Sequence, residues 1–168
     1  MQITMQDTLV PTANRMLGNL SGILDKAETF ATARKIEPSV LLNSRLAPDM
    51  FALTRQVQIA SDMIKGAAAR LSGTEIPKFE DNETTFAELK ARIAKTLAFV
   101  NSVDAAKYKG SEDRDITLQT RGGEVRFKGQ PYLLHYVLPN VYFHITTAYA
   151  ILRHNGVELG KTDFIGAS

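Results

Sequence analysis

Residues 132–156 read YLLHYVLPNVYFHITTAYAILRHNG, and this stretch decides the fold prediction. Apolar residues recur in it at intervals of three and four, which indicates a helix with one buried face. The members of that face are Val141, Ile145, Ala148, Ile151 and Leu152. We predict a helix that includes residues 140–154 and begins near Gln130. Pro139 must kink or restart it, because proline has no amide hydrogen to donate inside a helix, and Asn155-Gly156 predicts its end.

Three earlier segments carry the same helical period. The first runs from Asp7 to about Thr32, and a short turn around Pro38 and Leu41-Leu42 follows it. Pro48 favours the first turn of a second helix, from Asp49 to about Ser72, with Gly73 as its end. The third helix follows Pro77 and the acidic residues 80–83. Its start at Thr85-Phe-Ala-Glu88 fits a capping box, in which the Thr and Glu side chains each accept a hydrogen bond from the other's backbone amide.

A β-hairpin is predicted between the third and the last helix. Residues 116–119 and 125–128 alternate apolar and polar side chains on either side of a Gly122-Gly123 turn. A lone hairpin is marginal in water, so its apolar side should pack on the helices or on a second subunit. We therefore predict an all-α fold in a single domain over residues 1–168, a four-helix bundle with a hairpin inserted before the last helix.

Composition narrows the function classes. The chain has 168 residues, a formal charge of +2 and no cysteine. The absence of cysteine excludes thiol catalysis, disulfides and cysteine-ligated metal sites. Lysine and arginine are scattered rather than clustered, which argues against a nucleic-acid partner. Nothing approaches 18 consecutive apolar residues, so no membrane partner is expected. Residues 1–7 lack the features of a secretion signal, and we expect a cytoplasmic protein.

Two blocks of the sequence resemble a known family. Residues 47–67 read APDMFALTRQVQIASDMIKGA, and the second block is residues 132–156 continued by 160–166. Together they resemble a bacterial family of unknown function that is related in fold to the DinB/YfiT-like metalloenzyme superfamily. The resemblance covers nearly the whole chain. It implies an up-down-down-up four-helix bundle and a homodimer, and it implies no established reaction.

The histidines bear on the metal chemistry of that superfamily. Its members typically carry one histidine on the second helix and a His-x-x-x-His pair on the fourth. Here the second helix has no histidine, and Ala148 stands four residues after His144. On one straight helix His135 and His144 lie about 13.5 Å apart along the axis, and His144 and His154 lie about 15 Å apart. These three histidines therefore cannot converge on one ion. We expect no cofactor, or, under the alternative below, a divalent metal held by His144 and Asp62.

Five residues are candidates for a ligand site. Gln58, Asp62 and Lys65 form an i, i+4, i+7 row on the second helix, which fits either a solvated face with an Asp62–Lys65 ion pair or a cleft. If this row faces His144, Asp62 could orient its imidazole. His144 itself is either a structural histidine or a group of the site. Tyr142 belongs to a tyrosine-rich last helix that suits a pocket wall or an interface.

Two functions from different classes follow. The first is a metal-free homodimer that binds an unknown small molecule through Gln58, Asp62, Lys65, Tyr142 and His144. The alternative is a divergent DinB-like metal-dependent enzyme, a thiol-dependent transferase or hydrolase, with His144 and Asp62 on the metal. The sequence is compatible with both, and metal analysis of the purified protein distinguishes them.

Overall fold

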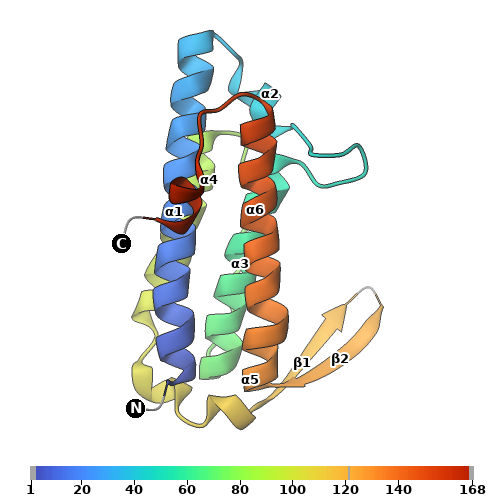
Figure 1. The fold of residues 1–168 in the computed structure, drawn as a ribbon. Helices are drawn as coiled ribbons and strands as arrows, with labels where there is room; N and C mark the ends of the chain where they lie inside the picture. The colour runs from blue at the N-terminus through green and yellow to red at the C-terminus, as the bar shows by residue number, and fades with distance from the viewer. Residues whose placement is uncertain (1–2, 121, 167–168) are drawn as a thin grey trace.

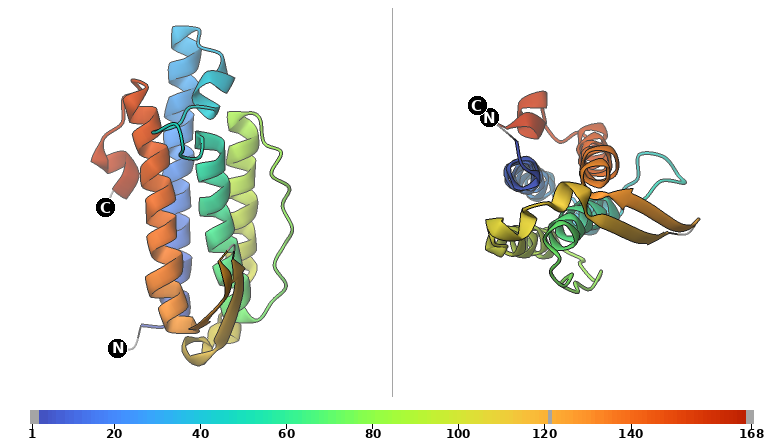
Figure 2. Two further views of the ribbon diagram at one scale, coloured as in Figure 1. Left: turned by 90° about the vertical axis from the view of Figure 1, so that its right-hand side faces the viewer. Right: turned by 90° about the horizontal axis from the view of Figure 1, so that it is seen from below.

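The computed structural model describes residues 3–120 and 122–166 of the chain. Within these residues four long helices form a bundle (Figure 1), namely α1 Met5–Arg34, α3 Leu53–Ser72, α4 Phe86–Ser102 and α6 Leu138–His154. Helices α1 and α6 run in one direction, and α3 and α4 run in the opposite one (Figures 1 and 2). The shorter elements are α2 Pro38–Leu42, α5 Gly129–Pro131, α7 Lys161–Ile165, and the 3-10 turns η1 Ala105–Tyr108 and η2 Ser111–Asp113. The predicted fold class is confirmed.

Two predicted helix ends form with the caps that the sequence provides. At α4 the Glu88 amide donates to the Thr85 hydroxyl at 3.1 Å, and the Thr85 amide donates to the Glu88 carboxylate at 3.0 Å. This is the predicted capping box, and it satisfies amides that have no partner inside the helix. Gly73 ends α3 as predicted, with a positive φ of 69° that suits glycine.

The predicted start of the second helix was wrong. Helix α3 begins at Leu53 rather than near Asp49, and Ala52 is its N-cap. Residues 44–52 form turns instead, because the Leu53 amide donates to the Ser44 carbonyl and the Met50 amide donates to the Ala47 carbonyl. Pro48 therefore lies in a loop, where its fixed φ is equally acceptable.

The last helix begins close to the predicted residue but is not uniform. A π-helical turn, η3 Tyr132–Val137, joins α5 to α6, and Pro139 falls in the first turn of α6. A wider turn next to proline is consistent with the missing amide and with the clash of its ring against the preceding turn. The predicted kink or restart at Pro139 corresponds to this change from a π-helical turn to an α-helix.

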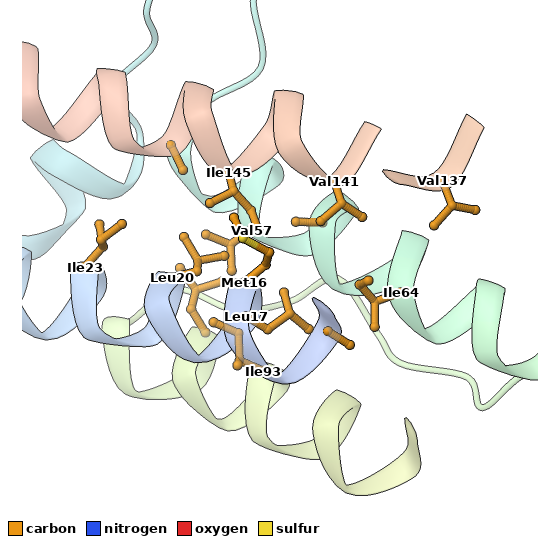
Figure 3. Close-up of a cluster of buried hydrophobic side chains, with 14 of the residues drawn as sticks. Met16, Leu17, Leu20, Ile23, Val57, Ile64, Ile93, Val137, Val141 and Ile145 are labelled. Atoms are coloured by element: carbon orange, nitrogen blue, oxygen red, sulfur yellow. The ribbon is translucent and has the colours of Figure 1, made fainter. Parts of the chain in front are cut away.

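The bundle encloses one apolar core. Figure 3 shows Met16, Leu17 and Leu20 of α1 meeting side chains from α3, α4 and α6. The labelled side chains from those helices include Val57, Ile64, Ile93, Val141 and Ile145, all buried. Burial of each such side chain contributes roughly 1.5–3 kcal/mol, which makes this core the main source of stability.

The hairpin consists of β1 Asp115–Thr120 and β2 Gly123–Lys128, paired antiparallel with Thr120 opposite Gly123. In this register Gly123 already belongs to β2 and Gly122 lies in the turn, while Arg121 lies outside the described residues. Ile116 and Leu118 are buried, and the apolar side therefore packs on the bundle. The rest of the hairpin projects away from the helices (Figure 2). Over the described residues no helix combines the length and hydropathy needed to span a bilayer.

Candidate functional site

A charged network covers the outer side of α3. Its centre is Arg92 of α4, whose side chain is 1% exposed. The guanidinium Nη1 donates to a Glu83 carboxylate oxygen at 2.8 Å and to the Glu80 carbonyl at 3.0 Å. Nη2 lies 2.9 Å from one carboxylate oxygen of Asp62 and 2.9 Å from one of Asp81. One buried cation thus holds three acidic side chains.

The acidic partners at 81 and 83 belong to residues 74–85, which we call the strap. The strap leads from the end of α3 back to the start of α4, so that these two helices run parallel (Figure 2). Burial alone would raise the pKa of Glu83, but hydrogen bonds from Arg92 and Gln58 outweigh it and hold that pKa below its usual value. Glu83 is therefore ionised at neutral pH and fixes the strap to the bundle.

The predicted row on α3 belongs to this network. Gln58 donates from its amide nitrogen to the other Glu83 oxygen at 2.9 Å. Lys65 pairs with Asp62 at 2.8 Å, as the spacing predicted, and its Nζ lies 4.1 Å from the centre of the Phe79 ring. Gln58 and Lys65 are buried rather than solvated, because the strap covers them.

His144 lies on the other side of α3 and is also buried. Its Nδ1 is 2.7 Å from the Gln56 side-chain oxygen, and the Gln56 amide nitrogen donates to the Phe51 carbonyl at 2.9 Å. Because the Gln56 oxygen can only accept, this pattern assigns the proton to Nδ1 and leaves Nε2 unprotonated in the neutral ring. Burial, and next the charge of Arg55, lower the pKa of His144. Its imidazole is neutral at pH 7.

The structure does not bring the five predicted residues together. The condition under which Asp62 could orient His144 is not met, because Asp62 faces Arg92, and Gln56 lies beside the imidazole instead. Tyr142 is 40% exposed on the surface of α6. His135 and His154 are exposed and distant from one another. Gln56 was missed, although a glutamine among Leu53, Val57 and Ala60 on an apolar stripe was a detectable signal.

The residues around His144 do not fit the metal site of the DinB-like superfamily. Such a site needs ligands that converge on one ion. Among the described residues no group of three or more histidine, aspartate or glutamate side chains is placed to hold a metal. The neighbour of His144 is an amide, and Ala148 is fully buried in the core. This donor set matches neither a zinc site nor a two-histidine iron site.

A cleft lies between the hairpin, α3 and the π-helical turn. Its cavity measures about 580 Å³, and its walls include Asp62, Met63, Arg70, Ile76, Leu118 and Tyr136. Volumes of roughly 300–1,000 Å³ are typical of small-molecule sites. Asp62 is the one predicted site residue on these walls.

An aromatic group closes one end of this cleft. The Tyr132 and Tyr136 rings stack with centres 6.0 Å apart, and Phe127 of the hairpin lies 5.2 Å from Tyr136. Arg70 donates from Nη1 to the Tyr132 hydroxyl at 3.1 Å. Burial raises the pKa of Tyr132 despite the opposing charge of Arg70, so that hydroxyl stays protonated. Sequence reasoning missed Arg70, because nothing local marks which cations have an acidic partner.

The chain is similar to known proteins over almost its whole length. Residues 5–165 match a family model described as a domain of unknown function, DUF1993. The chain belongs to the DUF1993 family. A crystal structure at 1.83 Å resolution of a DinB family member protein from Shewanella denitrificans is 47% identical, with a TM-score of 0.91. That match covers 97% of this chain and 92% of the other. No curated protein matches significantly.

The DUF1993 match and the Shewanella structure confirm the resemblance read from residues 47–67 and 132–166. The DUF1993 model spans all four long helices and the hairpin. The description of the DUF1993 family names no reaction.

Proposed function

We propose that this DUF1993 protein is a metal-free homodimer that binds a small organic molecule in the cleft beneath the hairpin. The observation that carries the proposal is the cleft itself, a cavity of about 580 Å³ whose walls combine apolar and aromatic side chains with polar and charged ones. This combination is typical of ligand sites. Among the residues first suggested, Asp62 takes part directly, while Gln58 and Lys65 hold the strap behind it.

Binding in the cleft can be tested with naphthalene probes and amide NMR spectra. We expect neutral 2-naphthamide to shift the signals of Met63, Tyr136 and the hairpin. The Met63→Trp variant fills the cleft and should abolish these shifts. Leu46→Trp, an exposed position in the 44–52 loop, is the matched control and should retain them. If neither 2-naphthamide nor charged naphthalene derivatives perturb the cleft, the proposal is wrong.

Exposed aromatic side chains support the homodimer. Tyr142 and Phe143 of α6 are 40% and 56% exposed, and Phe51 is 47% exposed. Phe143 packs edge-on against His144 at 5.3 Å, and Phe51 accepts the hydrogen bond from Gln56, so these groups neighbour one site. Apolar patches of this kind often mark interfaces. Light scattering should give twice the 18.5 kDa chain mass, and a mass of one chain at micromolar concentration contradicts the dimer.

A second candidate, the metal-dependent enzyme, is favoured by one observation. Histidines that bind metals commonly donate their other ring nitrogen to a carbonyl or carboxylate. The His144 Nδ1 makes such a bond with Gln56 and leaves Nε2 as a free donor atom for a cation. Elemental analysis decides between the two. We expect no stoichiometric transition metal, and one equivalent of zinc that is lost in His144→Gln would replace the first proposal with the second.

A further inference from the structure

We propose that the cleft selects small aromatic carboxylates and that Arg70 binds the carboxylate group. This inference rests on the proposed binding function and specifies its ligand. Three observations support it: the positive charge of Arg70 has no carboxylate partner among the described residues, its guanidinium is held in position, and apolar and aromatic side chains line part of the cleft.

The two charged side chains on the cleft walls are in opposite situations. One Asp62 oxygen already accepts from Lys65 at 2.8 Å and from Arg92 at 2.9 Å, so its charge is compensated. Arg70 is half-buried, and its hydrogen bond within the described residues goes to the neutral Tyr132 hydroxyl. No carboxylate among those residues pairs with it. The uncompensated charge in the cleft is therefore positive, and an anionic ligand would neutralise it.

Arg70 is held in place by its own helix. The guanidinium folds back over Gly66, one turn earlier, so that a Cβ at position 66 would lie 2.3 Å from Nη1. Glycine weakens a helix interior relative to alanine. Its presence in the middle of α3 is explained if the space above it has to hold a guanidinium. The Tyr132 hydroxyl, in the π-helical turn η3, accepts a hydrogen bond from the same guanidinium. Arg70 is therefore held in one position before a ligand binds.

The remaining chemistry favours a carboxylate over a phosphate. A guanidinium presents a planar fork of N–H donors that matches a carboxylate in a bidentate manner. A single cation balances the single charge of a carboxylate, whereas a phosphate monoester carries about two charges at neutral pH. The apolar side chains Met63, Ile76 and Leu118 and the Tyr136 ring offer a surface for an aromatic body.

The test compares 2-naphthoate with its neutral amide, 2-naphthamide, by calorimetry and amide NMR. We expect wild-type protein to bind 2-naphthoate more tightly, and Arg70→Gln to weaken it by about tenfold to hundredfold while leaving 2-naphthamide nearly unchanged. Arg153→Gln removes an exposed charge at the far end of α6 and is the matched control. Its affinity for both probes should equal that of wild type.

The Gly66→Ala variant tests whether the position of the Arg70 guanidinium, and not only its charge, determines the preference for 2-naphthoate. The added methyl displaces the guanidinium without removing it, and alanine favours the helix. We expect an unchanged or higher melting temperature together with a lost preference for 2-naphthoate. Equal binding of the two probes by wild type, or an unaltered preference in Arg70→Gln, overturns the carboxylate proposal while leaving cleft binding intact. If 2-naphthyl phosphate binds more tightly than 2-naphthoate, Arg70 selects phosphates and the proposal is also wrong.

Discussion

Arg92 of α4 and Arg70 of α3 show what a partner does to the charge of an arginine inside this protein. Arg92 lies under the strap and meets Asp62, Asp81 and Glu83. Arg70 lies at the hairpin cleft and meets only a tyrosine hydroxyl among the described residues. The first arginine uses both terminal nitrogens of its guanidinium to hold acidic side chains in place. The second keeps most of its hydrogen-bonding capacity, which supports the proposed binding of a ligand in the cleft.

The largest expected effect comes from Arg92→Met. Removing this cation leaves the nearly buried Glu83 without a cationic partner, whereas Asp62 keeps Lys65 and Asp81 keeps Arg55. Breaking a buried ion pair from one side costs about 3–5 kcal/mol, and partial exposure of Asp62 and Asp81 favours the lower end, about 3 kcal/mol. Urea unfolding measures it. Lys95→Met, an exposed cation on the same helix, is the control, and a loss as small as in that variant would contradict a central role for Arg92.

Arg70→Met should cost much less, about 1 kcal/mol in the free energy of unfolding. Here the loss is one hydrogen bond to the Tyr132 hydroxyl, and no carboxylate loses its partner. The same urea experiment compares the two variants directly. A cost equal to that of Arg92→Met would mean that Arg70 has a structural partner and is not available for a ligand.

Lowering the pH tests the Arg92 network through one of its carboxylates, Glu83. The pKa of Glu83 is lower in the folded chain than in the unfolded one. Its ionisation therefore stabilises the fold above the unfolded pKa of about 4.3, and this contribution is lost as the pH falls through the folded value. Urea unfolding of wild type and Glu83→Gln between pH 7 and pH 3 isolates it. The wild type should lose more stability over this range, and parallel curves would show that Glu83 is not coupled to Arg92.

The smallest effect is expected at a tyrosine without a partner. Burial raises the pKa of Tyr108 to about 12, and its hydroxyl has no hydrogen-bond partner within the described residues. Tyr108→Phe should leave the free energy of unfolding unchanged or raise it by up to about 1 kcal/mol. It should also remove a loss of stability between about pH 10 and pH 12. Tyr132→Phe, which removes the acceptor for Arg70, should destabilise instead, and a clear loss in Tyr108→Phe would reveal a partner.

Local patterns in the sequence predicted most of the fold. The stripe of Val141, Ile145 and Leu152 marked the buried face of the last helix, and Thr85 with Glu88 marked the start of α4. These signals depend on residues within a few positions of each other, where helix geometry fixes which side chains meet. Pro48 did not predict the start of α3 correctly, because proline suits a loop as well as a first helical turn.

The candidate site was less predictable, because its contacts join distant parts of the chain. Gln56 and His144 are 88 positions apart, and the strap that buries Gln58 and Lys65 looked like an ordinary acidic loop. Arg92 is next to Ile93, a residue of the apolar stripe of α4, and this position indicated that Arg92 could be buried. Its acidic partners could not be predicted, because they depend on the path of the strap. The cleft forms because the hairpin packs beside α3, and no local sequence pattern predicts the position of the hairpin relative to that helix.

The parallel arrangement of α3 and α4 has a kinetic consequence. Two antiparallel helices joined by a short turn can assemble from that turn, whereas here the chain must first travel back along about 25 Å of helix. The strap can settle only on helices that have already packed, so the Arg92 contacts should form after the rate-limiting step of folding. Interactions that form so late slow unfolding and leave the folding rate nearly unchanged. We therefore expect the contacts of the strap to lower the unfolding rate more than they change the folding rate.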